Sequence, residues 1–329
     1  MKNLKIAVLY GGCSSEHDIS IESAKSVIAN MGSGYTPIPI EITRDGDWFR
    51  QKDGAPAFLS PSRSGHILIT SHNNIIEKTN IDAVFPVLHG KNGEDGTIQG
   101  LCEMAGIPLV GCGTLSSALC MDKEKANRLV QTAGVKIPRS FLWEGKTDYE
   151  KARKIGYPLF VKPVRSGSSL GISKVSDAGD LADAFQTALR YDDNVICQEA
   201  VPGFEVGCAV MGNSELITGE VDEIELTGGF FDFTEKYQLV SSQIHVPARI
   251  SDQKAEEIKR TAKIIYRTLG CRGFARVDMF LTPEGELLFN EVNTIPGFTT
   301  HSRFPAMMEA AGMSLEQVIS YAIRLAVEQ

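Results

Sequence analysis

Residues 274–293 read FARVDMFLTPEGELLFNEVN, and this stretch decides what kind of structure the C-terminal half adopts. Two short apolar runs, Phe274–Phe280 and Leu287–Asn293, flank a Thr-Pro-Glu-Gly turn signal. Such a pattern predicts two antiparallel strands joined by a turn. We therefore expect a β-hairpin at this point of the chain.

Polar side chains gather on one face of this hairpin. Because side chains alternate along a strand, Arg276 and Asp278 share a face, as do Glu291 and Asn293 on the partner strand. All four lie on the same face in either of two registers at the turn: Leu281 opposite Glu286, or Thr282 opposite Leu287. Two carboxylates and an amide oxygen suit Mg²⁺ shared with phosphates. A solvated face with an Arg–Asp ion pair is the alternative, and spacing alone leaves both open.

The composition argues against several classes of protein. The 329 residues are 43% apolar, which is enough for a large core and favours more than one domain. The net charge is −8 and no basic block stands out, so we expect no nucleic-acid partner and no anionic membrane surface. The opening apolar run is too short for a signal peptide, and no stretch approaches the length of a membrane span. The cysteines, seven in number, show no C-x-x-C spacing, so we expect free thiols in a reducing cytoplasm.

The N-terminal third alternates strand and helix signals. Strands are expected at 5–10, 36–42, 81–88 and 108–110, and helices at 20–31 and 97–105. This rhythm predicts an open, mostly parallel sheet, which binds ligands at the loops that follow its strands. In one such loop Glu16 could pair with a substrate ammonium; the alternative is a tight turn with Ser20 as helix N-cap. The loop 89–96 has the same ambiguity.

A phosphate-binding pattern follows in the middle of the chain. Strands are expected at 157–164 and 171–175, joined by the turn 165–169, with Lys162 on the first strand. The backbone amides of such a turn can cradle phosphates, and a lysine adds charge. The order of residues is not that of a Walker A loop, and a Gly/Ser hairpin is usually only a turn. The stretch 223–242 lacks periodicity and is rich in Gly and aromatic residues, which is typical of a lid or binding loop.

Together these motifs resemble those of the D-alanine–D-alanine ligases, a family of ATP-grasp enzymes, over essentially the whole chain. The carriers are LYGG and SE within 9–16, LHG and GEDGTIQG within 88–100, MDK at 121–123, VKP and GSS within 161–169, RVD at 276–278, NEVNTIPG at 290–297 and HS at 301–302. Three further segments look most like the vancomycin-resistance G-type ligases, which make D-alanyl-D-serine: EVGCAV at 205–210, GFFDFTEKY at 229–237 and PGFTTHSR at 296–303.

The resemblance implies an ATP-grasp fold, α/β overall and α+β in the C-terminal half, with an N-terminal open parallel-sheet domain. It divides the chain into an N-terminal substrate-binding domain (1–121), a central ATP-grasp subdomain (122–204) and a C-terminal ATP-grasp subdomain (205–329) that carries the metal site and a lid loop (223–242). It also implies a homodimer.

The resemblance further implies which residues bind ATP and metal. Lys123 and Lys162 would neutralise the ATP phosphates, and the turn containing Ser169 would cover them. The adenine would meet Gln198, Glu199, Ala200 and Val201, and Glu205 would meet the ribose. The order Gln198–Glu199 leaves the adenine-side carboxylate open by one position. Two Mg²⁺ ions, or Mn²⁺, would be held by Asp278, Glu291 and Asn293, with Glu291 bridging.

The substrate contacts are implied in the same way. Glu16 would pair with the ammonium of the first D-alanine, and His89 would lie near that substrate. Ser168 and Tyr237 would link to Glu16 and close the lid. The oxyanion would be held by the Gly297 amide and by Arg276, which would serve there rather than as the ion-pair partner of Asp278. The carboxylate of the second substrate would be bound by Ser302 and Lys236.

Arg303 departs from the ordinary D-alanine–D-alanine ligases, which usually carry an apolar residue here, and matches the resistance-type branch. It could supply or position a hydrogen-bond partner for a substrate hydroxyl. The expected activity is ATP-dependent ligation of D-alanine to a second D-amino acid through an acyl phosphate, for peptidoglycan precursors and vancomycin resistance. D-serine is favoured as second substrate and D-alanine is a close second; a housekeeping D-alanine–D-alanine ligase is the alternative. A non-catalytic binding module would not need Asp278 and Glu291 together.

Overall fold

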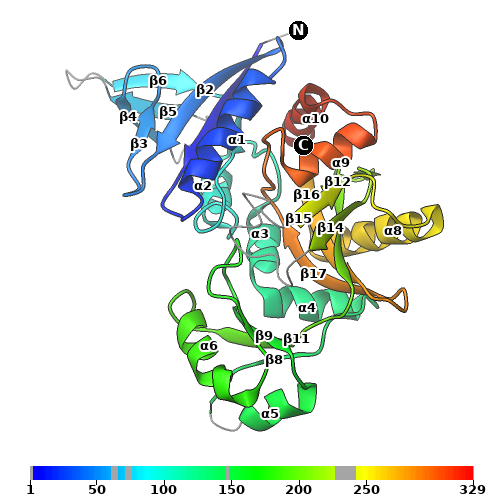
Figure 1. Ribbon diagram of the computed structural model, residues 1–329. Coiled ribbons are helices and arrows are strands. Elements are labelled where there is room, and N and C mark those ends of the chain that lie inside the picture. Colours follow the sequence, from blue (N-terminus) through cyan, green and yellow to red (C-terminus); the bar gives the residue numbers. More distant parts are fainter. Residues whose placement is uncertain (1–2, 61–65, 71–75, 146–147, 227–241, 329) are drawn as a thin grey trace.

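The computed structural model describes residues 3–60, 66–70, 76–145, 148–226 and 242–328, which form three sheets with helices packed on them (Figure 1). The N-terminal, central and C-terminal parts follow one another along the chain, in blue, green and yellow to red. In these ranges no helix has the length and apolarity needed to cross a membrane. All seven cysteines lie in the described ranges, as free thiols.

The N-terminal part is a seven-stranded sheet of order β6-β5-β4-β3-β2-β1-β7. Its strands are β1 (Leu4–Gly11), β2 (Tyr35–Ile42), β3 (Trp48–Arg50), β4 (Ala55–Leu59), β5 (His66–Thr70), β6 (Ile76–Asn80) and β7 (Ala83–Pro86). Strand β1 pairs in parallel with β2 and β7, whereas the pairings from β2 to β6 are antiparallel. The expectation of a mostly parallel sheet is therefore wrong beyond β2. Short strands joined by tight turns pair antiparallel, because a parallel pair needs a long crossover.

Helices cover this sheet and bring its loops into place. Helix α1 (His17–Ala29) follows β1, and α2 (Thr97–Ala105) follows the loop after β7. The alternative with Ser20 as N-cap is wrong, because α1 begins earlier and Glu16 occupies its N-cap position. Instead the Ser20 hydroxyl is fully buried, accepts the Gly11 amide at 2.7 Å and donates to the Val87 carbonyl. The Ser20 hydroxyl thereby connects the last residue of β1 to the residue that follows β7.

The central part has its own sheet and its own core. The sheet has four strands in the order β10-β9-β11-β8. They are β8 (Ser140–Leu142), β9 (Leu159–Pro163), β10 (Ser173–Val175) and β11 (Val195–Glu199), with helices α5 (Asp148–Ile155) and α6 (Leu181–Ala188). Apolar residues of both helices and three of the strands form one cluster, which includes Leu159 and Phe185.

The C-terminal part is a six-stranded sheet of order β15-β14-β12-β16-β17, with β13 paired to β12. Its strands are β12 (Phe204–Met211), β13 (Ile217–Thr218), β14 (Asp222–Leu226), β15 (Ser242–His245), β16 (Phe274–Leu281) and β17 (Leu287–Asn293), and its helices are α8 (Asp252–Thr268), α9 (Arg303–Ala310) and α10 (Leu315–Val327). Two helices from the segment between the N-terminal and central parts, α3 (Thr114–Met121) and α4 (Lys123–Thr132), pack against this part. Ala126 and Val130 of α4 join the core under this sheet. The domain limits at 121 and 204 stay a prediction.

An aromatic cluster joins the N-terminal and C-terminal parts. Phe85 of β7, Phe274 of β16, Phe298 and Phe304 of α9 pack with ring centroids 5.4 to 6.2 Å apart. They belong to one buried cluster that also includes residues of β1, α1 and α10. The loop after β7 and the segment after β17 therefore meet at one place.

Candidate active site

The hairpin of β16 and β17 presents its four polar side chains on one face, as predicted, but by a different register. Near the turn Leu281 lies opposite Leu287, which is neither of the two expected pairings. A β-bulge between Asp278 and Met279 then shifts the register, so that Asp278 faces Glu291 and Arg276 faces Asn293. The extra residue on β17 is Asn290, which has no pairing partner on β16. The bulge therefore sets which side chains reach this face.

These side chains fit the chemistry of a magnesium site that is shared with a substrate. Asp278, Glu291 and Asn293 offer two carboxylates and one amide oxygen. In the described part of the chain no group of three or more His, Cys, Asp or Glu side chains is arranged to hold a metal by itself. Mg²⁺ is usually bound by one or two carboxylates and completed by water and phosphate oxygens. The donor set therefore suits a cation that arrives with a nucleotide.

The expectation that Arg276 is not the ion-pair partner of Asp278 is wrong. The Arg276 Nε atom lies 2.9 Å from Asp278 Oδ1, and Nη2 lies 2.8 Å from Oδ2. Side chains two apart on a strand point the same way, and Asp278 is fully buried, so its charge needs a close partner. Burial alone would raise the pKa of Asp278, but the charges of Arg276 and Arg303 outweigh it and lower that pKa. Within the described residues Arg276 Nη1 makes no hydrogen bond, so Arg276 keeps a donor for a further anion.

Arg303 lies buried at the start of α9 and bridges three strands. Its Nε and Nη2 atoms donate to Asp222 of β14 at 2.6 and 2.8 Å, and Nη1 donates to Glu205 of β12 at 2.8 Å. Nη2 also lies 3.3 Å from Asp278 Oδ1 of β16. This arrangement favours the idea that Arg303 positions other groups, since its guanidinium is engaged by three carboxylates.

Asp222 is a site residue that the sequence reading missed. It is fully buried and accepts the Gly207 amide at 2.8 Å in addition to the two bonds from Arg303. The local sequence GEVDEIEL at 219–226 carries four acidic residues and does not single out Asp222. Gly207 leaves room for this cluster: a Cβ there would collide with Arg303 Nη2 and would lie 2.6 Å from Asp222 Oδ1 and 2.9 Å from Asp278 Oδ1.

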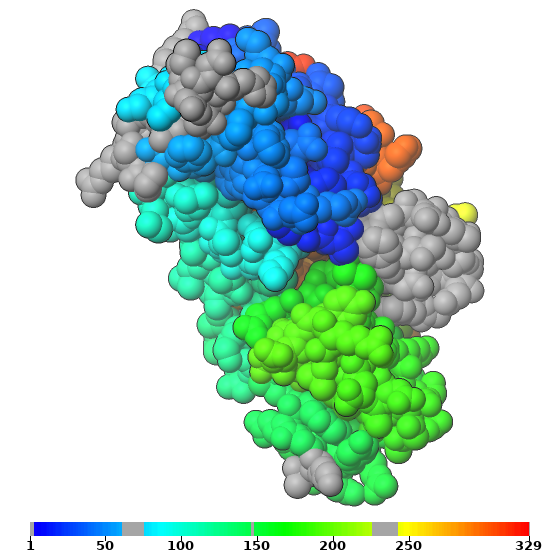
Figure 2. Space-filling view, turned by 90° about the vertical axis from the view of Figure 1, so that its left-hand side faces the viewer, coloured from blue at the N-terminus to red at the C-terminus, as the bar shows by residue number. Residues whose placement is uncertain are grey.

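Glu16 and Ser168 meet between the N-terminal and central parts. The Ser168 hydroxyl donates to Glu16 Oε1, although the two residues are 152 positions apart. Both are buried, and Figure 2 shows the blue N-terminal part against the green central part. Ser168 and Ser169 have φ angles of 50° and 58°, a left-handed conformation that is uncommon outside glycine. Such backbone conformations are held only where the surrounding structure enforces them and concentrate at functional sites.

The lysines expected to meet phosphates lie around one turn of the central part. Lys123, at the start of α4, donates from Nζ to the Ser166 carbonyl at 2.6 Å. Lys162, on β9, donates from Nζ to Gln198 Oε1 at 2.7 Å. The Lys123 ammonium group therefore lies at the turn, whereas Lys162 stands on the strand that leads into it.

Gln198 and Glu199 point in opposite directions from β11. Gln198 is buried against Lys162, whereas Glu199 accepts the Arg139 amide at 2.7 Å and the Arg139 side chain at 2.5 Å. The side chain of Gln198, and not the carboxylate of Glu199, therefore lies on the same side of the sheet as Lys162. Ala200 and Val201 follow this strand, and the Ala200 amide donates to Pro158 at 3.2 Å.

Glu205, the expected ribose partner, lies near the hairpin face. It accepts Arg303 Nη1 at 2.8 Å and Asn290 Nδ2 at 3.3 Å. Its role toward ribose stays a prediction.

His89 and Glu94 lie buried in the loop after β7, against the segment that follows β17. His89 Nδ1 lies 2.9 Å from the Ile295 carbonyl, and Glu94 Oε1 accepts the Ile295 amide at 3.3 Å. Burial lowers the pKa of His89, partly offset by Glu16. Burial, with the Glu16 charge, raises the pKa of Glu94 to about 8. The His89 ring contacts the Ile295 carbonyl and the Ser23 hydroxyl, and its expected place near the first substrate stays a prediction.

Gly297 and Ser302 are brought together at the start of α9. A Cβ on Gly297 would lie 2.5 Å from Ser302 Oγ. Ser302 Oγ accepts the Thr299 amide at 3.1 Å and lies 2.8 Å from Thr299 Oγ1. Gly297, expected at the oxyanion, and Ser302, expected at the carboxylate of the second substrate, are thus neighbours.

Lys236 and Tyr237 lie outside the described residues, as does 227–241 of the expected lid loop. The flanks of that loop are described: β14 and β15 pair antiparallel with Leu226 opposite Ser242. Of these two strands, β14 also pairs with β12, whereas β15 lies at the edge of the sheet.

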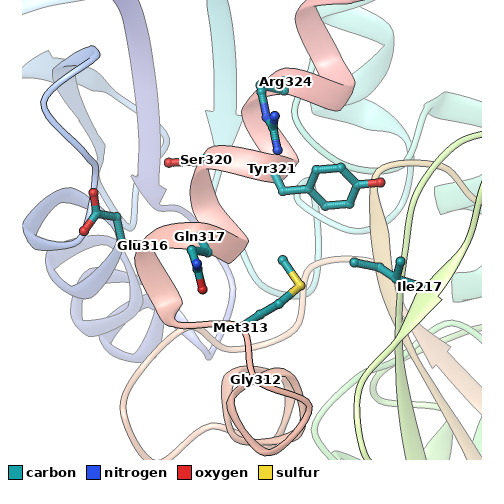
Figure 3. A pocket seen from close by; sticks show the side chains of 8 residues that line it. All are labelled: Ile217, Gly312, Met313, Glu316, Gln317, Ser320, Tyr321 and Arg324. Carbon is teal, nitrogen blue, oxygen red and sulfur yellow. The ribbon is translucent and has the colours of Figure 1, made fainter.

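An open groove elsewhere is not part of this site. It lies on α10 and β13, where Met313, Tyr321 and Ile217 line it (Figure 3). None of its lining residues is among the expected site residues.

Comparison with known proteins adds independent evidence. Family models described as "D-ala D-ala ligase N-terminus" and "D-ala D-ala ligase C-terminus" match residues 5–112 and 129–324. The vancomycin B-type resistance protein VanB of Enterococcus faecalis is 46% identical, with 100% of both chains covered. A D-alanine–D-alanine ligase of Caldicellulosiruptor bescii is 44% identical, covering 100% of this chain and 96% of the relative. The crystal structure of the VanG D-Ala:D-Ser ligase from Enterococcus faecalis is 49% identical with a TM-score of 0.90, covering 99% of this chain and 100% of that one.

Proposed function

Because the chain belongs to the D-alanine–D-alanine ligase family, we propose that it joins D-alanine to a second D-amino acid and prefers D-serine to D-alanine in the second position. Members of this family are ATP-dependent ligases, and vancomycin-resistance proteins are among its relatives here. The dipeptide would be built into peptidoglycan precursors.

The first half of the reaction activates a poor electrophile. The γ-phosphoryl group moves from ATP to a carboxylate oxygen of the first D-alanine, and ADP and an acyl phosphate result. Catalysis of such a transfer is mostly positioning and charge stabilisation. We assign Lys123 and Lys162 to the phosphates: Lys123 Nζ is bonded to the Ser166 carbonyl of the turn, and Lys162 lies on β9, the strand that leads into the turn. Magnesium would be held by Asp278, Glu291 and Asn293, and would neutralise phosphate charge.

The second half forms the peptide bond. The amine of the second substrate attacks the acyl carbon, an oxyanion develops, and the C–O bond to phosphate breaks as the amine loses a proton. Arg276 Nη1 and the Gly297 amide are our candidates for holding the oxyanion. Glu16, at the N-cap of α1 and bonded to Ser168, would hold the ammonium of the first D-alanine.

The preference for D-serine is carried by one observation: Arg303 directly follows Ser302 and is held inside the protein by Asp222 and Glu205. An apolar pocket distinguishes a hydroxyl from a hydrogen only weakly, by roughly 10²-fold, whereas a site built to bond the hydroxyl discriminates much more strongly. Arg303, whose guanidinium is engaged by Asp222 and Glu205, would position a hydrogen-bond partner for the added hydroxyl. The likeness to a D-Ala:D-Ser ligase supports the same choice.

Product analysis tests this proposal. The protein is incubated with ATP, Mg²⁺ and equal D-alanine and D-serine, and the dipeptides are identified by mass spectrometry. We expect D-alanyl-D-serine as the main product, with D-alanyl-D-alanine as the lesser one. Formation of D-alanyl-D-alanine alone would refute the D-serine preference. Absence of any D-alanine-dependent phosphate release would refute the ligase function itself.

A housekeeping D-alanine–D-alanine ligase is the second candidate. The 44% identity with such an enzyme over the whole chain favours it. The same experiment decides between the two, since the housekeeping enzyme would leave D-serine unused.

A further inference from the structure

The segment that follows β17 carries two of the proposed functional groups, and it is held from the N-terminal part. Asn293 and Gly297 lie two residues before and two residues after Ile295. Both main-chain groups of Ile295 are bound by the loop after β7. Glu94 Oε1 accepts its amide at 3.3 Å, and His89 Nδ1 donates to its carbonyl at 2.9 Å.

Glu94 joins this segment to its own loop. Its second oxygen, Oε2, accepts the Gly90 amide at 2.8 Å, so one buried carboxyl group fixes Gly90 and Ile295 together. Gly90 directly follows His89, and the His89 carbonyl accepts the Ser14 hydroxyl at 2.7 Å. The loop that carries Glu16 is thereby attached to the same network.

A third contact comes from α1. The buried hydroxyl of Ser23 accepts the Phe298 amide at 3.4 Å and lies 3.3 Å from His89 Nε2. Because a carbonyl can only accept, His89 Nδ1 carries the proton, and a neutral ring then accepts at Nε2 from Ser23. His89 and Ser23 therefore have consistent donor and acceptor roles in this chain of bonds. We name Glu94, His89 and Ser23 the 295-clasp.

We propose that Glu94 is a positioning residue of the ligase reaction: through the 295-clasp it fixes the main chain between Asn293 and Gly297. This inference rests on the proposed function, because Asn293 and Gly297 matter only if magnesium and an oxyanion are bound there. Glu94 itself touches no proposed substrate group. A misplacement of about 1 Å in a catalytic group can cost on the order of 10²-fold in rate, so a loosened segment lowers turnover.

The 295-clasp does not touch the proposed ATP side of the site. Lys123, Lys162 and Gln198 lie on α4, β9 and β11, and their described bonds go to other groups. Loss of Glu94 should therefore act mainly on kcat; the KM for ATP should change less, and only through the proposed magnesium ligand Asn293. A larger effect on kcat than on the KM for ATP distinguishes a positioning role of Glu94 from general destabilisation of the protein.

The experiment compares Glu94→Gln and Glu94→Ala with a matched control, Asp148→Asn. Asp148 is also a fully buried carboxylate that accepts two main-chain amides, those of Glu144 and Gly145, but it lies in the central part. We expect kcat to fall about 10- to 100-fold in Glu94→Ala and less in Glu94→Gln, which keeps one acceptor. Asp148→Asn should lose thermal stability without a comparable loss of kcat.

Hydrogen–deuterium exchange provides a readout that does not depend on activity. In Glu94→Ala the Ile295 amide loses its acceptor, so exchange of residues 294–298 should become faster than in the wild-type protein.

Unchanged exchange would show that Glu94 does not hold the segment, and faster exchange with unchanged kcat would show that holding it is irrelevant to turnover. Either result overturns the proposal, as would an equal loss of kcat in Asp148→Asn. A wild-type protein without D-alanine-dependent turnover would overturn both the proposed function and the role of Glu94 in it, while the exchange result would still decide whether the 295-clasp exists.

Discussion

At the scale of single residues, two arginines determine how charge is arranged on the hairpin face. Arg276 pairs with Asp278, and Arg303 bridges Asp278, Asp222 and Glu205. Burying a carboxylate is costly unless it is paired and hydrogen-bonded. Asp278, one of the carboxylates proposed to hold magnesium, is thus kept ionised inside the protein, because the guanidinium groups of Arg276 and Arg303 lower its pKa.

Arg276→Ala tests the oxyanion role. We expect turnover to fall by on the order of 10²–10³, because one well-placed oxyanion donor is worth about that much. The KM for ATP should change little, since the proposed phosphate lysines lie on other elements. Steady-state phosphate release gives both constants. An Arg276→Ala enzyme with near-normal turnover would exclude Arg276 from the oxyanion site.

Gly207→Ala tests how tightly the carboxylates and Arg303 are packed. The new methyl group would collide with the Arg303 guanidinium and crowd Asp222 and Asp278. We expect a loss of about 1–3 kcal/mol in unfolding free energy, with a loss of activity. Gly34→Ala is the control, because a Cβ there has no neighbour within 4 Å. Equal unfolding free energies for the two variants would contradict this packing.

Glu94 should make stability depend on pH. Its pKa is raised from the ordinary value of 4.5 to about 8, chiefly by burial. The folded protein thus holds this proton more tightly than the unfolded chain does. The protonated Glu94 therefore contributes its full stabilisation below the ordinary pKa of 4.5, and this contribution is lost as pH rises through the folded-state pKa of about 8. Glu94→Gln cannot titrate, so its unfolding free energy should fall less across that window. Urea unfolding at both ends of the window measures the difference, and parallel pH profiles would contradict it.

At the scale of elements, the bulge in β17 resolves a conflict between core and site. Phe289 packs in the core, and Glu291, two residues later, faces the site. A regular strand would place both on one face. The extra residue Asn290 reverses the alternation, and its side chain donates to Glu205. Without the bulge, the register at the turn would put Asn290 opposite Asp278.

The turn between β9 and β10 is a second element whose backbone matters. Ser169 has a φ of 58°, which a β-branched side chain adopts poorly. We expect Ser169→Val to destabilise the central part by about 1–2 kcal/mol and Ser169→Gly to be tolerated. Both variants lack the hydroxyl, so their difference isolates the backbone. Equal unfolding free energies would show that this φ is not enforced.

At the scale of the whole molecule, the N-terminal and C-terminal parts share a core while the central part has its own. Phe85, Phe274, Phe298 and Phe304 connect the first two parts, and Leu159 and Phe185 belong to the separate cluster. The proposed site lies where all three parts meet. Glu16 contacts Ser168 of the central part, and the 295-clasp holds the segment after β17.

Phe298→Ala tests this division. Loss of a buried phenylalanine costs about 3–5 kcal/mol, and we expect the loss to fall on the N-terminal and C-terminal parts together. Trp48 of β3 reports on the N-terminal part, and Trp143, packed against Phe185, reports on the central part. In single-tryptophan variants the Trp48 transition should shift to lower denaturant and the Trp143 transition should not. Equal shifts would mean that the three parts unfold as one unit.

Much of this arrangement could be predicted from local sequence, and some could not. The turn at 282–285 and the flanking apolar runs correctly predicted β16 and β17, because strand period and turn chemistry are local properties. The extent of parallel pairing was predicted wrongly, because the short strands β3 to β6 pair antiparallel. Asp222 was missed because nothing near it in sequence indicates that Arg303, 81 positions away, would reach it.

The sequence by itself determined the family, the positions of most strands and helices, and the types of donors and acceptors available to the site. Only the tertiary structure decided which of them meet: Glu16 with Ser168, Arg303 with Asp222, and Glu94 with Ile295. It also decided that Arg276 pairs with Asp278 and that Asn290 forms the bulge. Turns and strand periods are set by neighbouring residues, whereas these contacts depend on how separate cores pack and on buried charges taking the closest partner.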